Sequence, residues 1–195
     1  DPLWSRGLGD VYKRQALSQG LEAHGRTLGV VGFGGIGQLT ARLAAGLGMR
    51  IVACDAALPA THPVWAESGA TPLPLEALLA QADAVSLHVP LNADTRHLLN
   101  ADRIRGMRPG AILVNTSRGG IVDEAALAAA LRMGHLRGAA LDVFDQEPLP
   151  AGGPLADAPN LILTPHIAGL TQEANTRVSD MVAAGVTIAL TGGAR

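Results

Sequence analysis

The stretch that decides the fold is Thr27–Gly37, which reads T-L-G-V-V-G-F-G-G-I-G. An apolar run that suits a β-strand passes directly into the pattern G-x-G-x-x-G, and an apolar helical pattern follows over Ile36–Leu47. In this context the first glycine permits a tight turn, the second lets the backbone approach a pyrophosphate, and the third lets helix and strand pack closely. Free N–H groups at the start of the helix favour phosphate. The stretch therefore predicts a dinucleotide site, formed by Gly32, Gly34, Gly35, Ile36 and Gly37.

A second apolar run, Arg50–Cys54, ends at Asp55, eighteen residues after Gly37. An acid at this place can accept hydrogen bonds from the adenosine ribose hydroxyls, and it repels a 2′-phosphate. The two alanines that follow Asp55 supply no cation to hold such a phosphate. The pattern favours NAD over NADP, although FAD enzymes and some methyltransferases also place a glycine-rich turn after their first strand. The later residues discriminate against those classes.

Short apolar runs alternate with amphipathic stretches along the chain. Several runs are apolar throughout, as in strands that are covered on both faces. This order predicts an α/β fold, a Rossmann-type doubly wound parallel sheet with right-handed crossovers, over residues 16–190. Pro59–Pro74 contains four prolines and one short helical stretch, and is interpreted as an ordinary connection. The expected strands are Leu28–Phe33, Ile51–Cys54, Ala84–Val89, Ala111–Val114, Ala139–Val143 and Leu161–Leu163, and the expected helices are Ile36–Leu47, Pro74–Ala82, Asp123–Met133 and about Thr171 to Leu190.

The composition is that of a globular domain, with 48% apolar and 16% charged residues and a net charge of −2. The absence of a basic run argues against a nucleic-acid or anionic-membrane partner, and no apolar stretch approaches the ~20 residues of a membrane span. No His, Cys and Asp cluster has metal-ligand spacing, so no metal is expected. The single cysteine, Cys54, excludes an internal disulfide and indicates the cytoplasm. Cys54 itself is expected to be a small buried residue and not a reactive thiolate.

Residues 1–15 differ from the rest of the sequence. The only lysine and the only tyrosine of the chain, Lys13 and Tyr12, lie there, whereas twelve arginines and no lysine follow from Ala16 onward. The segment Asp10–Gln15 can be back-translated to a common transposase adaptor. We therefore expect residues 1–15 to be adaptor-derived, on a fragment from a GC-rich bacterial genome.

Three further segments follow expected strands, at the sheet edge where open α/β sheets bind their ligands. They are Asn115–Asp123 (NTSRGGIVD), Leu141–Pro148 (LDVFDQEP) and Leu163–Gly169 (LTPHIAG). In these motifs, their order and their spacing, the chain resembles the D-isomer-specific 2-hydroxyacid dehydrogenases from about Arg26 to the final helix. The resemblance implies an NAD-dependent oxidoreductase that transfers a hydride between nicotinamide and C2 of a small 2-hydroxy or 2-oxo acid.

The resemblance also implies a role for each residue of these motifs. Arg118 holds the substrate carboxylate and carbonyl, Glu147 pairs with His166, and His166 is the acid/base. Asp142 holds the nicotinamide carboxamide. The other expected cofactor contacts are Val89, Pro90, Thr95, Thr116, Ser117 and Gly169, together with Arg118 and His166.

The chemistry independently needs these side chains. Reduction of a 2-oxo acid requires a proton at the developing alkoxide, and histidine is the natural donor because its ordinary pKa is ~6.5. A neighbouring carboxylate favours the protonated ring and orients it. A guanidinium offers a planar fork that matches a carboxylate bidentately, and it polarises the carbonyl.

The resemblance further implies a substrate domain that this sequence does not contain, with residues 191–195 as a truncated return toward it. We therefore expect the chain to bind NAD but to turn over poorly, and to form a homodimer through the cofactor domain.

Glu147 argues against formate dehydrogenase, which resembles this pattern but has Gln at that place. Thr171–Asn175 resembles members that act on hydroxypyruvate, phosphoglycerate or sulfolactate, and the choice among them stays open. The alternative is an NAD(H)-sensing module of the corepressor type on the same scaffold.

Overall fold

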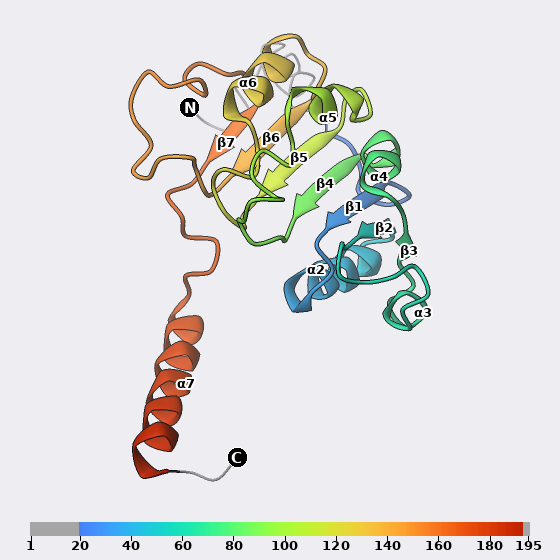
Figure 1. The fold of residues 1–195 in the computed structure, drawn as a ribbon. Coiled ribbons are helices and arrows are strands. Elements are labelled where there is room, and N and C mark those ends of the chain that lie inside the picture. The colour runs from blue at the N-terminus through green and yellow to red at the C-terminus, as the bar shows by residue number, and fades with distance from the viewer. Residues whose placement is uncertain (1–19, 193–195) are drawn as a thin grey trace, which may run out of the picture.

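The computed structural model describes residues 20–192, so the expected adaptor segment 1–15 and residues 193–195 lie outside it. A seven-stranded sheet has the order β3-β2-β1-β4-β5-β6-β7, and every neighbouring pair is parallel (Figure 1). The predicted doubly wound sheet is therefore confirmed. The strands are β1 (Thr27–Val31), β2 (Arg50–Cys54), β3 (Thr71–Pro72), β4 (Ala84–Leu87), β5 (Ile112–Asn115), β6 (Gly138–Leu141) and β7 (Leu161–Leu163).

Helices cover both faces of the sheet and form two separate hydrophobic cores. Successive residues of a strand point to opposite faces, so Val30 packs in the core beneath α2 and Val31 packs in the core on the other side. The Trp65 ring of α3 packs against the Phe33 ring at a centroid distance of 4.8 Å, in the hydrophobic core on the α2 side of the sheet. The helices are α2 (Gly35–Gly46), α3 (Val64–Ser68), α4 (Leu75–Gln81), α5 (Ala101–Gly106), α6 (Glu124–Arg132) and α7 (Gln172–Thr191).

The predicted strands and helices end within one or two residues of the observed ones, and β3 and α5 were not predicted as elements. β1 ends at Val31 and not at Phe33, because Gly32 turns the chain with φ +91°. β3 is a two-residue strand inside the segment Pro59–Pro74, too short for a periodic pattern to show. The short helix α5 was not expected from periodicity, but the Asn100 side chain caps it by accepting a hydrogen bond from the Arg103 N–H at 3.0 Å.

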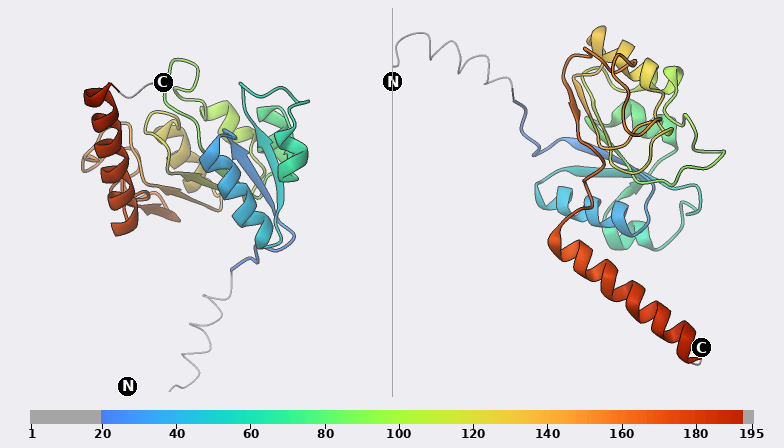
Figure 2. Two further views of the ribbon diagram at one scale, coloured as in Figure 1. Left: turned by 90° about the horizontal axis from the view of Figure 1, so that it is seen from below. Right: turned by 90° about the vertical axis from the view of Figure 1, so that its left-hand side faces the viewer.

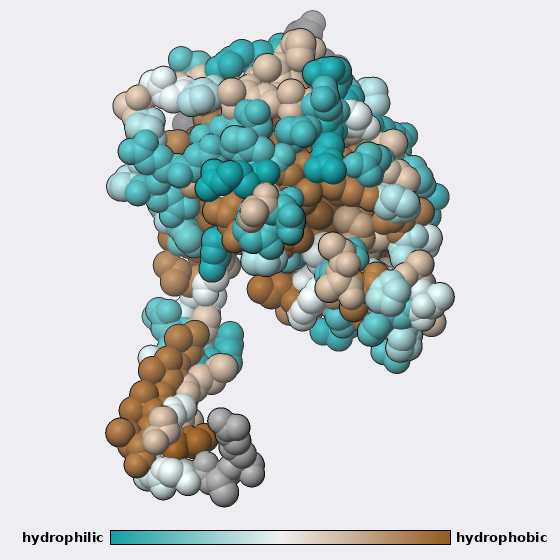
Figure 3. All heavy atoms as spheres, in the orientation of Figure 1, coloured by the Kyte–Doolittle hydropathy of each residue, from teal (hydrophilic) through white to brown (hydrophobic). Residues whose placement is uncertain are grey.

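Helix α7 extends away from the sheet, and none of its described residues is buried (Figures 1 and 2). Thr171 caps it by accepting a hydrogen bond from the Ala174 N–H. In Figure 3 one side of this helix is a continuous apolar surface. Among the described residues, no helix is both long and apolar enough to cross a membrane. The exposed apolar residues of α7 are Val178, Met181, Val182, Val186, Ile188 and Leu190, and those of α2 and its end are Ile36, Leu39, Leu43 and Leu47.

Candidate active site at the carboxyl edge of the sheet

The glycine loop joins β1 to α2 and leaves no room for side chains at two of its positions. A Cβ at Gly32 would lie 2.5 Å from the His88 carbonyl oxygen, and a Cβ at Gly37 would collide with the Gly32 carbonyl oxygen. At Gly34 and Gly35, by contrast, no described atom lies within 4 Å of an added Cβ. The loop is therefore tight where strand and helix meet and open where a pyrophosphate can approach the backbone.

Asp55 fixes the glycine loop from the end of β2. Its Oδ2 accepts a hydrogen bond from the Phe33 N–H at 2.7 Å, and its Oδ1 accepts one from the Ala57 N–H at 2.8 Å. A cavity of about 460 Å³ lies beside this carboxylate and is lined by four predicted cofactor residues, Gly32, Asp55, Val89 and Thr95, and by others including Leu58 and Trp65. The residues present thus fit an adenosine ribose and its ring.

Thr95 and Pro90 belong to one braced turn after β4. The Thr95 hydroxyl donates to the Pro90 carbonyl at 2.6 Å and accepts from the Asn92 N–H at 2.8 Å. Asn92 accepts from the N–H groups of Asp94 and Thr95 at 2.9 Å each, a role that sequence reasoning missed. An Asn two residues after a Pro is a common turn signal and could have indicated this brace.

Asn115, the last residue of β5, shapes the loop that carries Arg118. Its buried side chain donates to the Arg118 carbonyl at 2.9 Å and accepts from both the N–H and the hydroxyl of Ser117, at 3.1 and 2.8 Å. Thr116 and the Arg118 side chain are exposed on this loop, and the guanidinium donates to the Ser117 carbonyl. Arg118 therefore stands at the carboxyl edge on a loop with a defined shape.

Gly119 holds the Arg118 loop against the turn that carries Glu147. A Cβ at Gly119 would collide with the Phe144 carbonyl and would lie 3.0 Å from the Asp145 nitrogen. The two segments thus pack backbone against backbone. This contact brings together two motifs that are separated by more than twenty residues in the sequence.

Glu147 and His166 form the predicted pair. His166 Nδ1 lies 2.7 Å from Glu147 Oε2, and Glu147 Oε1 accepts a hydrogen bond from the Phe144 N–H at 3.0 Å. The hydrogen bond to His166, and then the one from Phe144, hold the pKa of the Glu147 carboxyl below its usual range. His166 has φ +56°, a conformation that costs energy in a side-chain-bearing residue and is found where surrounding contacts impose it.

Asp142 supplies those contacts from beneath the His166 loop. This buried carboxylate accepts hydrogen bonds from the Thr164 hydroxyl at 2.6 Å and from the N–H groups of Ile167 and Ala168 at 2.9 and 2.8 Å. Burial disfavours the charged form, but the three hydrogen bonds outweigh it and the pKa of Asp142 is lowered. The carboxylate therefore orders the segment on both sides of His166.

The variant Asp142→Asn is expected to be less stable than wild type by about 1–3 kcal/mol at neutral pH, because an amide NH₂ then faces a buried N–H donor. Because folding lowers the pKa of Asp142, its carboxylate stabilises the fold at pH values above about 3.9, the pKa of Asp in an unfolded chain. This stabilisation is lost as the pH falls through the pKa that Asp142 has in the folded protein. The stability difference between the two proteins should therefore shrink below about pH 4. Urea unfolding at neutral and acidic pH measures it, with Thr164→Val as the control that removes one neutral hydrogen bond. A difference that does not depend on pH contradicts this account.

Two further titratable groups near the site are not catalytic candidates. His88 bonds to the Ser86 hydroxyl at 2.9 Å, and burial lowers its pKa. Burial and the neighbouring Asp55 raise the pKa of Cys54 to about 11, which agrees with an unreactive thiol. Within residues 20–192, no His, Cys, Asp and Glu side chains gather in a group that could hold a metal.

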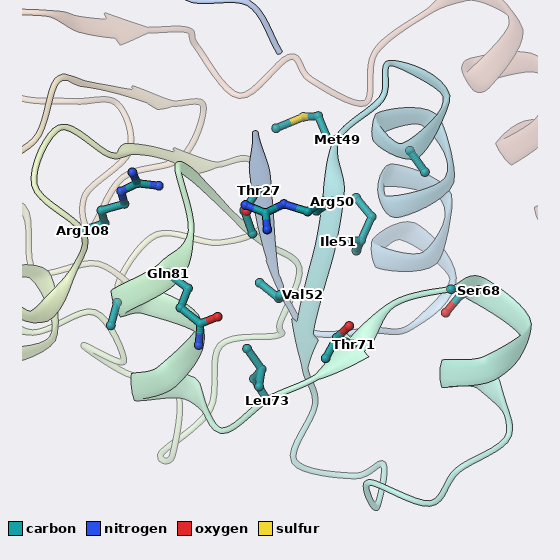
Figure 4. A pocket seen from close by; sticks show the side chains of 13 residues that line it. Thr27, Met49, Arg50, Ile51, Val52, Ser68, Thr71, Leu73, Gln81 and Arg108 are labelled. Carbon is teal, nitrogen blue, oxygen red and sulfur yellow. The ribbon is translucent and has the colours of Figure 1, made fainter. Parts of the chain in front are cut away.

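Another cavity, of about 700 Å³, lies at the opposite edge of the sheet, where the strands begin (Figure 4). Arg50, Arg108 and Thr27 line it, and Arg108 is paired with Asp83 at 2.8 Å. None of the predicted site residues is among the residues that line it. The glycine loop, Arg118 and the Glu147–His166 pair all lie instead at the carboxyl edge, where open α/β sheets bind their ligands.

The fold is that of a dinucleotide-binding domain, and its carboxyl edge carries a hydrogen-bonded Glu147–His166 pair. Residues 5–168 match the family model described as "D-isomer specific 2-hydroxyacid dehydrogenase, NAD binding domain". The chain belongs to this family, and its cofactor is NAD.

Known relatives agree with this assignment. The (S)-sulfolactate dehydrogenase of Chromohalobacter salexigens is 52% identical over 174 residues, which are 89% of this chain and 56% of that protein. The glyoxylate reductase of Korarchaeum cryptofilum is 47% identical over 164 residues, 84% of this chain and 49% of that protein. The structure of D-lactate dehydrogenase from Aquifex aeolicus complexed with NAD and lactic acid superposes with a TM-score of 0.80 at 32% identity, over 95% of this chain and 61% of that one. The chain thus spans about half the length of the curated relatives it matches.

Proposed function

We propose that this domain serves the reversible reduction of a small 2-oxo acid to the 2-hydroxy acid, with NAD(H) as cofactor. The observation that carries the proposal is the Glu147–His166 hydrogen bond of 2.7 Å at the sheet edge that also holds the glycine loop. The contact between Gly119 and Phe144 brings the Arg118 loop to the same place. An acid–base pair, an anion-binding guanidinium and a dinucleotide loop are what this reaction needs.

Each side chain has a defined task in this proposal. Glu147 binds Nδ1 of His166 and orients the ring, so Nε2 is the nitrogen that exchanges a proton with the substrate oxygen at C2. The Arg118 fork binds the substrate carboxylate and polarises its carbonyl. The bound NADH supplies the hydride. Asp142 Oδ2 accepts one hydrogen bond, from Ala168, and can accept a second from the nicotinamide carboxamide.

The remaining predicted residues complete the cofactor site in our proposal. The exposed loop residue Thr116, and Ser117 beside it, contact the nicotinamide half together with Gly169. Val89 and Thr95 line the cavity beside Asp55, and Pro90 is hydrogen-bonded to Thr95. We further propose that the domain comprises residues 16–190, acts in the cytoplasm, and self-associates through exposed apolar surface such as that of α2.

The chain alone is expected to turn over poorly, because hydride transfer gains from water exclusion by a second domain.

Turnover by the full-length gene product tests the proposed function. NADH oxidation is followed against glyoxylate, hydroxypyruvate, pyruvate, phosphohydroxypyruvate and sulfopyruvate, with Arg118→Gln as the matched variant. Reduction of one acid by wild type and its loss in the variant support the proposal and name the substrate. Tight NADH binding with no turnover of any acid counts against it, and favours an NAD(H)-sensing module.

Replacement of Asp55 by Ser is expected to weaken NADH binding by about 10-fold or more, because charge-assisted hydrogen bonds to the ribose hydroxyls contribute about 1.5–3 kcal/mol. NADPH binding should improve relative to NADH, since the repulsion of the 2′-phosphate is removed. Fluorescence titration of the 195-residue chain with each cofactor measures both effects. Glu67→Gln, which removes an exposed carboxylate of α3, is the charge-matched control. Wild-type protein that binds NADPH as tightly as NADH disproves this assignment of Asp55.

A further inference from the structure

The turn that carries Glu147 is anchored by a carboxylate from a different element. Glu124 is the first residue of α6, and its Oε1 accepts a hydrogen bond from the Asp145 N–H at 2.8 Å. The motif that carries Arg118 ends one residue earlier, at Asp123, so sequence reasoning assigned Glu124 no role.

Two consecutive backbone donors of this turn are each bound by a glutamate. Phe144 donates to Glu147 Oε1 at 3.0 Å, which ties the Glu147 side chain to its own turn. Asp145 donates to Glu124, which ties the turn to α6. Glu147 Oε2 then reaches His166 Nδ1 at 2.7 Å. The position of the imidazole is thus connected to α6 through three short hydrogen bonds.

The two ends of this connection differ in how firmly they are held. Helix α6 buries Leu127, Ala128, Ala130 and Leu131 in the core, so Glu124 stands on a rigid element. Residues 145–148 are exposed. Apart from the backbone contact with Gly119, a turn of exposed residues has few packing contacts, so its hydrogen bonds also determine where Glu147 lies.

The surroundings of Glu124 make its charge costly. Partial burial raises its pKa; the Asp145 N–H bond lowers it, the charges of Asp145 and Asp123 raise it, and His97 lowers it. His97 also lies 3.9 Å from the Asp145 carboxylate. A carboxylate kept beside two others is explained by the oxygen acceptor that it provides to the Asp145 N–H.

We infer that Glu124 is a positioning residue for the Glu147–His166 pair: it accepts the Asp145 N–H and thereby sets the distance between Glu147 and His166. Glu124 needs to touch neither substrate nor cofactor. The role of Glu124 in turnover rests on the proposed function, whereas its effect on the distance between Glu147 and His166 does not.

The test compares Glu124→Ala, Glu124→Gln and Glu124→Asp by NMR of the 195-residue chain. The readouts are the carboxyl ¹³C titration of Glu147, assigned with Glu147→Gln, and the Nδ1–H resonance of His166. Glu124→Ala should raise the pKa of Glu147 toward its ordinary value, because both of its hydrogen bonds weaken, and should shift the His166 resonance. Glu124→Gln keeps an oxygen acceptor and should restore wild-type signals. Glu124→Asp keeps the charge but shortens the reach, and should resemble Ala.

Asn100→Ala is the matched control for a general loss of stability. Asn100 caps α5 by accepting from the Arg103 N–H at 3.0 Å, so its loss should lower the Tm and leave both signals unchanged. In the full-length enzyme, Glu124→Ala should reduce kcat by about 10- to 100-fold at similar KM, as small misplacements of reacting groups do, and Gln should rescue it.

Wild-type NMR signals in Glu124→Ala, or equal shifts in Asn100→Ala, overturn the inference. If Glu124→Ala does not fold, the signals of Glu124→Asp are compared with those of Glu124→Gln. The inference then requires altered signals in Glu124→Asp and wild-type signals in Glu124→Gln. If Glu124→Ala alters the Glu147 and His166 signals but the full-length protein reduces no 2-oxo acid, the inference is supported and the proposed function is contradicted. The inference and the proposed function can therefore fail separately.

Discussion

Full-length enzyme that carries His166→Gln is expected to lose about 100- to 10,000-fold in kcat, the contribution typical of a positioned general acid–base. Gln has a similar reach and can still hydrogen-bond Glu147, which lies 2.7 Å from the ring in wild type. It has no proton to exchange near neutral pH. NADH affinity should change far less than kcat, since the proton exchange that His166 performs takes place in the transition state.

The companion variant Glu147→Gln distinguishes a pair from two independent residues. If Glu147 acts only through His166, the double variant should be as slow as His166→Gln alone. Steady-state and stopped-flow measurements of NADH oxidation give both numbers. A His166→Gln enzyme with wild-type kcat refutes the assignment of the acid–base.

The second large effect is expected at Gly119. A Cβ there would collide with the Phe144 carbonyl, which is backbone and cannot rotate away. Gly119→Ala must therefore separate the Arg118 loop from the Glu147 turn. We expect a stability loss of about 1–3 kcal/mol, typical of overpacking, and a fall in kcat of about 100-fold, because Arg118 and Glu147 no longer face the substrate together.

Gly46→Ala is the matched control, because no described atom lies within 4 Å of a Cβ at this helical position of α2. This substitution should stabilise the protein by about 0.5–1 kcal/mol, since alanine is favoured over glycine in helices. Urea unfolding reports stability and NADH oxidation reports activity. If Gly119→Ala has the same stability and the same kcat as Gly46→Ala, the Arg118 loop and the Glu147 turn do not depend on the contact between Gly119 and Phe144.

Local patterns predicted most of the fold. Strands such as Leu161–Leu163 were predicted with their observed ends, because each is a short apolar run with polar flanks. The boundary of β1 was wrong by two residues because Phe33 is apolar for a tertiary reason, its contact with Trp65. Neither β3 nor α5 contains enough residues for a periodic signal. Their positions depend on neighbours that are distant in the sequence.

The candidate site was predictable where a motif carries the chemistry. Arg118, Glu147 and His166 stand in short segments whose residue types match the reaction, and the structure pairs two of them directly. The supporting contacts were not predictable. Glu124 acts through a single hydrogen bond to the backbone of a segment that is distant in the sequence, which no local pattern encodes. The threefold bonding of Asp142 to the His166 loop likewise appears only when β6 and β7 lie side by side.

The most direct test of the central claim is isotope transfer from NADH to the acid. The full-length enzyme is incubated with NADH carrying deuterium at the transferable position of C4 and with the acid that the panel selects, and the product is analysed by NMR and mass spectrometry. The account predicts one deuterium at C2 of the hydroxy acid and a solvent-derived proton on its oxygen. A product whose C2 hydrogen comes from solvent, or NADH that binds and transfers deuterium to no acid, would contradict it.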